Sequence, residues 1–152
     1  MRCFFPGSFD PVTKGHMDII RRAAALFDGV TVAVMINPAK KPLFSAEERV
    51  EMIKKCCKEL PNVTVTSGSG FTYQLAKDCG CGVLLRSLRS GADADLEVQL
   101  AMGNRAVGDI DTVAMFTSAE YSYISSSLVR EILAHHGDVS KLVPEEILED
   151  MK

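Results

Sequence analysis

Short apolar runs alternate along the chain with segments whose apolar residues recur every three or four positions. The short runs predict strands, and the longer periodic segments predict helices. The expected strands cover residues 3–5, 30–36, 62–66, 83–85 and 112–116. The expected helices cover 13–27, 45–60, 71–79, 93–106, 125–137 and a last segment that begins at 144. This alternation predicts an α/β fold over residues 1–152: a single-domain, Rossmann-like, doubly wound parallel sheet with helices on both faces.

Polar residues, glycine and proline predict where several of these helices begin and end. Thr13 is expected to be the N-cap of the first helix. Ser45 and Glu48 have the spacing of a capping box, in which each side chain accepts a hydrogen bond from the other residue's backbone. Gly80 is expected just beyond the helix over 71–79, and Pro144 suits the first position of the last helix.

Charged and hydroxyl residues follow four of the predicted strands, at the points where these strands end. The four segments are 7–16, 37–42, 86–89 and 117–127. Ligands of open parallel sheets bind beyond the carboxyl ends of the strands. We therefore expect one rim of the sheet to gather a histidine, two lysines, two arginines and a run of hydroxyl groups: His16, Lys40, Lys41, Arg86, Arg89 and the serines and tyrosines of 121–127.

The loop after the first strand is the most informative of these segments. It contains Gly7, which lets a ligand approach the backbone, and Ser8, whose hydroxyl can donate to a phosphate. It leads into a helix start, where free N–H groups and the helix dipole favour an anion. The loop therefore indicates phosphate chemistry, although a plain strand-to-helix turn remains an alternative. Asp10 is expected to cap or brace the loop.

His16 is the candidate catalytic residue of this loop. A histidine in the first turn of a helix tends to lose its proton, because the helix start disfavours positive charge. A neutral imidazole still has one N–H to donate to a phosphorus-bound oxygen in a transition state. The alternative is a cap or an ordinary surface residue.

Most of the other candidate residues also have more than one interpretation. Lys40 can neutralise an acidic substrate or be solvated, while Arg86 and Arg89 directly follow a buried strand and suit phosphate. Glu97 can accept from a ribose, fix an arginine or be an exposed helical carboxylate. The serines at 125–127 offer hydroxyls and free N–H groups to a phosphate, or simply supply a redundant N-cap.

Composition excludes several classes of function. The net charge is −3, which argues against a broad nucleic-acid surface, and no apolar run approaches membrane-spanning length. Five cysteines with no CxxC spacing and no secretory signal predict a reduced, cytoplasmic protein without a metal site. The chain also lacks the P-loop, G-x-G-x-x-G and G-x-S-x-G motifs.

With these motifs in view, the chain resembles the bacterial phosphopantetheine adenylyltransferases, a family of the nucleotidylyltransferase superfamily. The superfamily signatures T/H-x-G-H and I-S-S-S/T-x-x-R are present as Thr13–His16 and Ile124–Arg130. The similarity extends to P-G-S-F-D-P at 6–11, K-K-P-L-F-S-A-E-E-R at 40–49 and R-S-L-R at 86–89. It covers nearly the whole chain.

The resemblance implies transfer of the adenylyl group of ATP to 4′-phosphopantetheine, with Mg²⁺ and without a covalent enzyme intermediate. It implies catalytic roles for His16, Lys40 and Arg89, and acceptor contacts for Ser8, Lys40, Thr72 and Arg86. It also implies a homohexamer. The residues implied to contact the nucleotide are Ser8, Phe9, His16, Ser87, Leu88, Arg89, Glu97, Tyr121, Ser122, Tyr123, Ile124, Ser125, Ser126 and Ser127.

Two other functions are compatible with the residues. One is nucleotidyl transfer to a different acceptor, such as nicotinate mononucleotide or glycerol phosphate. The other is a nucleotide-binding module without catalysis. The Lys40 loop and the R-S-L-R segment argue against the first, and His16, Lys40 and Arg89 argue against the second.

Overall fold

The sheet of this protein consists of five parallel strands, which a computed structural model describes together with the rest of residues 1–152. The strands are β1 (Arg2–Gly7), β2 (Gly29–Met35), β3 (Val63–Gly68), β4 (Val83–Leu88) and β5 (Asp111–Phe116). The helices are α1 (Lys14–Leu26), α2 (Ala46–Cys56), α3 (Thr72–Asp78), α4 (Gly91–Gly108) and α5 (Ser126–Ala134). Two short 3₁₀ helices, η1 (Ala119–Tyr121) and η2 (Glu145–Met151), complete the fold.

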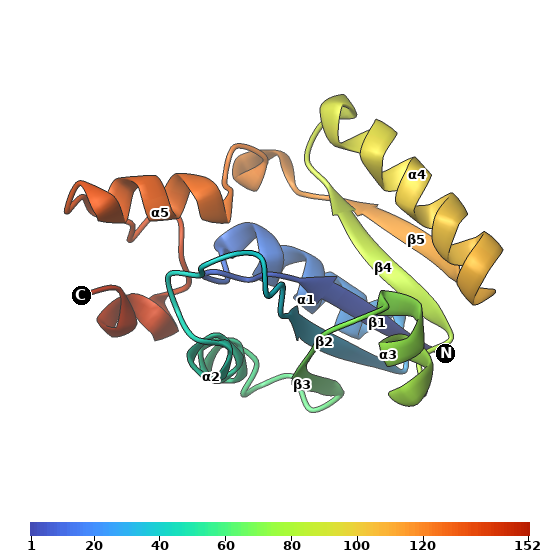
Figure 1. The fold of residues 1–152 in the computed structure, drawn as a ribbon. Helices are drawn as coiled ribbons and strands as arrows, with labels where there is room; N and C mark the ends of the chain where they lie inside the picture. The colour runs from blue at the N-terminus through green and yellow to red at the C-terminus, as the bar shows by residue number, and fades with distance from the viewer.

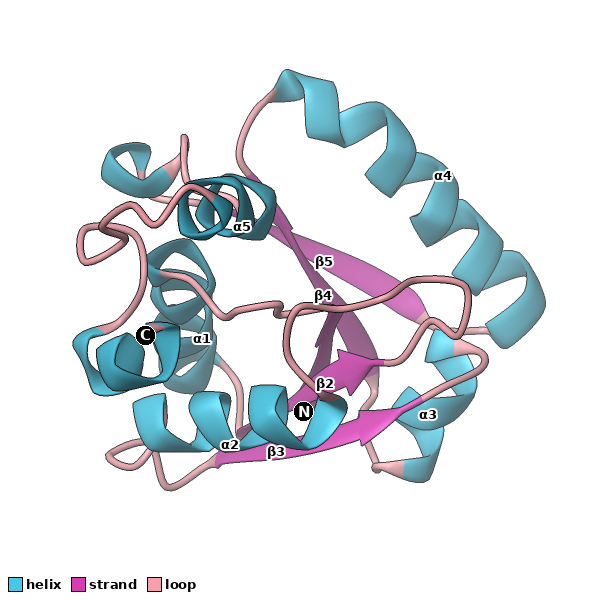
Figure 2. Ribbon diagram, turned by 60° about the vertical axis from the view of Figure 1, so that its left-hand side comes forward, coloured by secondary structure: helices cyan, strands magenta, loops and turns pink.

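The strand order is β3-β2-β1-β4-β5, so the chain reverses direction across the sheet between β1 and β4. Figures 1 and 2 show α1 and α2 on one face of the sheet and α3 and α4 on the other. The predicted doubly wound parallel sheet with helices on both faces is therefore confirmed. Sheets of this kind bind ligands at the point of reversal, beyond the carboxyl ends of the strands.

Alternate residues of the three inner strands β2, β1 and β4 pack into two separate apolar layers. Cys3 and Phe5 of β1 face the larger core with α1, whereas Phe4 faces a smaller core that includes Ala76 of α3. Because both faces are covered, β1 and β2 are almost wholly buried, which explains their continuous apolar runs.

The junction between β1 and β4 has the fewest paired residues in the sheet. Six residue pairs join β1 to β2, but only Cys3–Val83 and Phe4–Leu84 join β1 to β4. Beyond these two pairs the strands separate toward their carboxyl ends. The Arg86 side chain spans the gap, with Nη1 donating to the Pro6 carbonyl at 3.1 Å.

The predicted ends of the elements differ from the observed ones in small ways. Thr13 is the N-cap of α1 as expected, but the capping box predicted for Ser45 and Glu48 is only half formed: Ser45 accepts from the Glu48 N–H, and no return bond is made. The exposed Glu48 carboxylate is instead left to solvent. The segment after Pro144 forms a 3₁₀ helix. No helix of the structure has the length and apolar character needed to cross a membrane.

Candidate active site

A cavity of about 340 Å³ opens at the carboxyl ends of β1 and β4, where the strand order reverses. It is lined by residues from all four of the segments expected to meet at the rim. The lining consists of Ser8, Phe9, Thr13, Gly15, His16, Lys40, Arg86, Ser87, Arg89, Asp93, Glu97, Thr117, Ile124, Ser125, Ser126, Ser127 and Arg130.

His16 is fixed in one orientation by the start of its own helix. The Thr13 hydroxyl accepts from the His16 backbone N–H at 3.3 Å, and His16 Nδ1 accepts from the Thr13 backbone N–H at 3.0 Å. These two bonds form a capping box in which histidine takes the place usually held by glutamate. Because Nδ1 is an acceptor, the proton of the neutral ring resides on Nε2, which has no partner in the protein and can donate to a ligand.

The same surroundings keep His16 neutral. Burial and, to a smaller extent, the positive charge of Arg89 together lower the pKa of His16 from 6.5 to about 4. At neutral pH the imidazole is therefore a hydrogen-bond donor rather than a general acid, as the sequence predicted from the helix start.

The depressed pKa of His16 predicts a specific pH dependence of stability. Between about pH 6.5 and pH 4 the unfolded chain binds a proton at this residue and the folded chain does not, so stability is lost as the pH falls through this window. A His16→Gln variant is expected to lose less stability over the same window. Thermal unfolding of both proteins at pH 7 and pH 4.5 measures the difference, and identical pH dependence would contradict a neutral, buried ring.

Phe9 lies beneath His16. The residue is 2% exposed, and its ring packs edge-on against the His16 ring, with centroids 4.8 Å apart, and against Phe5. A Cβ on Gly7 would approach the Phe9 ring to 3.0 Å, so glycine at this position keeps the ring under the imidazole. Phe9 lines the cavity as expected, but its ring is packed against those of Phe5 and His16 and is not free to stack on a nucleotide base.

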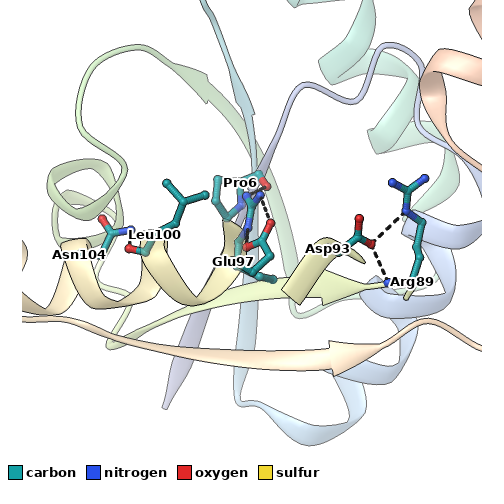
Figure 3. A network of polar contacts seen from close by, with 7 residues as sticks. Pro6, Arg89, Asp93, Glu97, Leu100 and Asn104 are labelled. Carbon is teal, nitrogen blue, oxygen red and sulfur yellow. Dashed lines mark hydrogen bonds and ion pairs between the residues drawn. The ribbon is translucent and has the colours of Figure 1, made fainter. Parts of the chain in front are cut away.

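Glu97 and Arg86 form a two-pronged ion pair (Figure 3). Arg86 Nε donates to Glu97 Oε2 at 2.7 Å, and Nη2 donates to Oε1 at 2.8 Å. Of the interpretations open from sequence, the one in which Glu97 fixes an arginine is present in the structure. The pair links β4 to α4 and, with the bond to Pro6, holds the guanidinium in the gap beside β1.

Arg89 is held more loosely, at the start of the connection to α4. Its backbone N–H donates to Asp93 Oδ2 at 3.0 Å, and its Nε lies 3.4 Å from the same oxygen (Figure 3). Hydrogen bonding from that N–H holds the pKa of Asp93 below its usual range. Arg89 Nη1 also lies 3.4 Å from the Ile124 carbonyl, so the side chain bridges β4 and the segment before α5.

Lys40 lies between two cavities and has no hydrogen-bond or ion-pair partner for its ammonium group. The second cavity, about 230 Å³, also contains Lys41, Arg49 and Arg130. With one carboxylate, Asp10, among four cationic side chains, this region is strongly positive.

Not every expected residue reaches the main cavity. Thr72 lines a smaller cavity of about 70 Å³, which is shared with Arg86, Leu100 and Asn104 and adjoins the main one through Arg86. Leu88 and the three residues of 121–123 do not line the cavity, although Ile124 to Ser127 do. The η1 turn carries residues 119–121 away from the cavity before the chain returns at Ile124.

Sequence reasoning missed five lining residues: Thr13, Gly15, Asp93, Thr117 and Arg130. Arg130 was visible as the last residue of the I-S-S-S-x-x-R signature, and one helical turn places it beside Ser127, to which it donates at 3.2 Å. Asp93 had a weaker signal, namely its position four residues after Arg89. Thr117 had none.

The fold and the site together define a nucleotidyltransferase class of protein: residues 4–132 match the model of the cytidylyltransferase-like family. Curated relatives include the "Phosphopantetheine adenylyltransferase" of Finegoldia magna, which is 45% identical, and that of a Picosynechococcus species, which is 49% identical; the alignments cover 99% of this chain in both cases, and 94% and 85% of the relatives. The Synechocystis protein of the same name is 48% identical, and the alignment covers 99% of this chain and 96% of that relative. The chain belongs to the phosphopantetheine adenylyltransferase family.

Proposed function

We propose that this protein transfers the adenylyl group of ATP to 4′-phosphopantetheine, which yields dephospho-coenzyme A and pyrophosphate. The observation that carries the proposal is the meeting of the His16 Nε2–H, the unpaired Lys40 ammonium and the Arg86 and Arg89 guanidinium groups around one cavity. Nucleotidyl transfer depends mainly on positioning and charge stabilisation, and this set of groups supplies both.

In the proposed reaction an oxygen of the acceptor phosphate attacks the α-phosphorus of ATP. The new P–O bond forms as the bond from the α-phosphorus to the bridging oxygen breaks, and that electron pair leaves with pyrophosphate. His16 Nε2–H donates to an oxygen on the α-phosphorus as negative charge develops there. The one hydroxyl within hydrogen-bond distance of the His16 ring is that of Thr13, 3.2 Å from Nδ1; it is buried and serves as the cap of α1, so the geometry favours direct attack by the acceptor.

The acceptor is expected to place its phosphate near Lys40 and Arg86 and its pantetheine arm toward the smaller cavity with Thr72. That cavity adjoins Arg86, and its lining combines apolar Leu100 with the amide of Asn104, which suits a chain of methylenes and amides. Asn104 Nδ2 donates to the Leu100 carbonyl, so its Oδ1 remains free to accept from a ligand (Figure 3).

We propose that Mg²⁺ enters with ATP. No group of three or more histidine, cysteine or acidic side chains is placed to hold a metal ion. Asp93 and Glu97, the acidic residues of the cavity, are both paired with arginines. Phosphate oxygens and water are the ligands that Mg²⁺ commonly takes in such sites, and the ion would neutralise charge on the departing pyrophosphate.

We also propose that the protein acts in the reduced cytoplasm as a homo-oligomer, a hexamer by its resemblance to the family. All five cysteines are unpaired. Five apolar side chains of α4 and two of the edge strand β5 are exposed, which is more than a lone monomer usually shows: Leu96, Val98, Leu100, Met102, Val107, Val113 and Phe116. Light scattering on the purified protein measures the assembly.

The proposed reaction is tested by incubating the purified protein with ATP, Mg²⁺ and 4′-phosphopantetheine. Pyrophosphate release and dephospho-coenzyme A, identified by mass spectrometry, are the expected products. Nicotinate mononucleotide and glycerol phosphate are tested as competing acceptors. Faster transfer to either one would change the acceptor, and ATP binding without pyrophosphate release from any acceptor would indicate a non-catalytic module.

A further inference from the structure

In the loop between β1 and α1, several carbonyl groups accept hydrogen bonds from side chains, while several N–H groups have no acceptor. Side chains from β4, α2 and α5 donate to the carbonyl of Pro6 at the end of β1 and to those of Ser8, Asp10 and Pro11 in the loop, at 2.8–3.1 Å. The N–H groups of Ser8, Phe9 and Asp10 have no acceptor within the protein. The free N–H groups present partial positive charge to a ligand, which favours an anion. The side chains that bind the carbonyl groups therefore determine the direction of the N–H groups.

Arg49 holds the central carbonyl of this loop. The residue lies on α2, 41 positions away from Ser8, and is 4% exposed. Its Nη1 donates to the Ser8 carbonyl at 2.9 Å, and its Nε donates to the carbonyls of Phe44 and Ser45 at 3.0 and 3.3 Å. No carboxylate forms an ion pair with it. Burying a guanidinium without a counter-ion is costly, so the bonds that it makes to these carbonyls must offset a large desolvation penalty.

The bond to the Ser8 carbonyl also fixes the Phe9 N–H. The Ser8–Phe9 peptide is planar and trans, so its carbonyl and its N–H point in opposite directions. Holding the carbonyl toward α2 turns the Phe9 N–H away from α2. Phe9 lines the cavity while its ring packs edge-on against Phe5 and His16, so its N–H, which has no acceptor within the protein, is the polar group that it can offer a ligand.

The backbone of Phe9 would not keep this conformation unaided. Its φ of 48° is in the left-handed region, which is unfavourable for a bulky side chain and persists only where neighbouring groups hold it. Arg49 holds the peptide group before Phe9, and Arg130 holds the Asp10 carbonyl after it at 2.8 Å. The loop is thus clamped on both sides of its strained residue.

The β1–α1 loop is also bonded to residues 43–45, which directly follow the segment that contains Lys40. The Asp10 carboxylate accepts from the N–H groups of Leu43 and Phe44, both at 2.9 Å, while Arg49 donates to the carbonyls of Phe44 and Ser45. The segment 43–45 is therefore joined to the β1–α1 loop by both its N–H and its carbonyl groups. Since this segment directly follows Lys40 to Pro42, loosening it would also loosen the lysine.

We propose that Arg49 is a positioning residue for the reaction. It acts through the backbone of Ser8 and Phe9, directs the Phe9 N–H toward the reacting phosphate, and holds the Lys40 segment against the same loop. This inference rests on the proposed function for its kinetic test. Its structural content concerns the Phe9 N–H and can be tested without turnover.

Two variants separate the shape of the guanidinium from its charge. Arg49→Lys keeps the charge but cannot donate to three carbonyls in a fixed fork, and Arg49→Met removes both. Each is expected to lower kcat about tenfold or more while changing KM for ATP much less, because misplacing a donor affects the transition state most. Arg2→Met, at the opposite end of the sheet and bonded to Thr31 and Thr64, is the matched control with unchanged kcat.

A structural role alone would lower Tm and leave the kcat of the folded protein unchanged. Wild-type kcat in folded Arg49→Lys would therefore overturn the inference, as would a loss confined to KM. If Arg49→Met does not fold, the kcat of Arg49→Lys and the response of the Phe9 amide in the wild-type protein still test the inference.

The backbone amide of Phe9 gives a readout that is independent of catalysis. In ¹⁵N-labelled wild-type protein, the Phe9 signal is expected to shift when ATP or inorganic pyrophosphate is added. In Arg49→Lys the signal is expected to start from a different position and to respond less, whereas Arg2→Met behaves like the wild type. A wild-type Phe9 amide that ignores both ligands would overturn the inference. The expected response without product formation would overturn the proposed function alone.

Discussion

Replacing His16 with alanine is expected to lower kcat at least about a hundredfold and to leave ATP binding largely intact, because one positioned donor to a developing oxyanion contributes roughly 2.7–4 kcal/mol. The physical reason is the orientation of the ring. Nδ1 is occupied by the Thr13 N–H, so the free Nε2–H is the only polar group that the ring offers to the cavity. Alanine removes that donor without adding or removing charge, since the imidazole is neutral at pH 7.

Turnover by pyrophosphate release and ATP affinity by calorimetry are the two measurements for this variant. His135→Ala is the matched control, because His135 is an exposed histidine at the end of α5 and is expected to leave kcat unchanged. Tm of both variants shows whether the protein remains folded. An unchanged kcat in folded His16→Ala would remove His16 from the chemistry.

Replacing Arg89 with alanine is expected to lower kcat/KM for ATP about tenfold to a hundredfold, the range for losing one hydrogen bond to a charged phosphate. The side chain is partly exposed and only weakly engaged by Asp93 and Ile124, at 3.4 Å each, so it is free to turn toward a nucleotide. Its loss also leaves the Asp93 carboxylate as an unmatched negative charge in the cavity, which repels the triphosphate.

Two further variants separate these effects. Arg105→Ala removes an arginine with the same spacing to an aspartate at the far end of α4, and is expected to leave kcat/KM unchanged. The double variant Arg89→Ala/Asp93→Ala lacks the repulsive carboxylate as well, so it is expected to recover part of the kcat/KM that Arg89→Ala loses. Equal ATP affinity and equal rate in Arg89→Ala and the wild type would mean that Arg89 is an ordinary surface residue.

The sequence predicted the sheet and its rim well, because burial on two faces leaves a direct signal in apolar runs such as that of β2. The rule that ligands lie beyond strand ends then brought His16, Lys40, Arg86 and Arg89 to one cavity. The cap of α1 was also visible, since Thr13 is three residues before His16 and such spacing is local.

Other features depend on contacts between distant segments and could not be read from the chain. The pairing of Glu97 with Arg86 requires knowing that α4 lies over the end of β4, and the hold of Arg49 on Ser8 requires the packing of α2 against the first loop. Phe9 offered a misleading signal: a left-handed conformation is normal for glycine, and an aromatic residue in a loop is usually expected to be exposed. These long-range contacts decide which side chains face the cavity.

The short pairing between β1 and β4 leaves little backbone hydrogen bonding to resist a twist between the two halves of the sheet. The two residue pairs at Cys3 and Phe4 are the only backbone ladder between the half of the sheet with β2 and β3 and the half with β5. A slight twist about this narrow seam would alter the spacing between His16, on the first half, and Arg89, on the second, without unfolding either half. Such a twist would change how closely the two sides of the cavity approach a ligand, and the Arg86 side chain, bonded to Pro6 across the gap, would limit it.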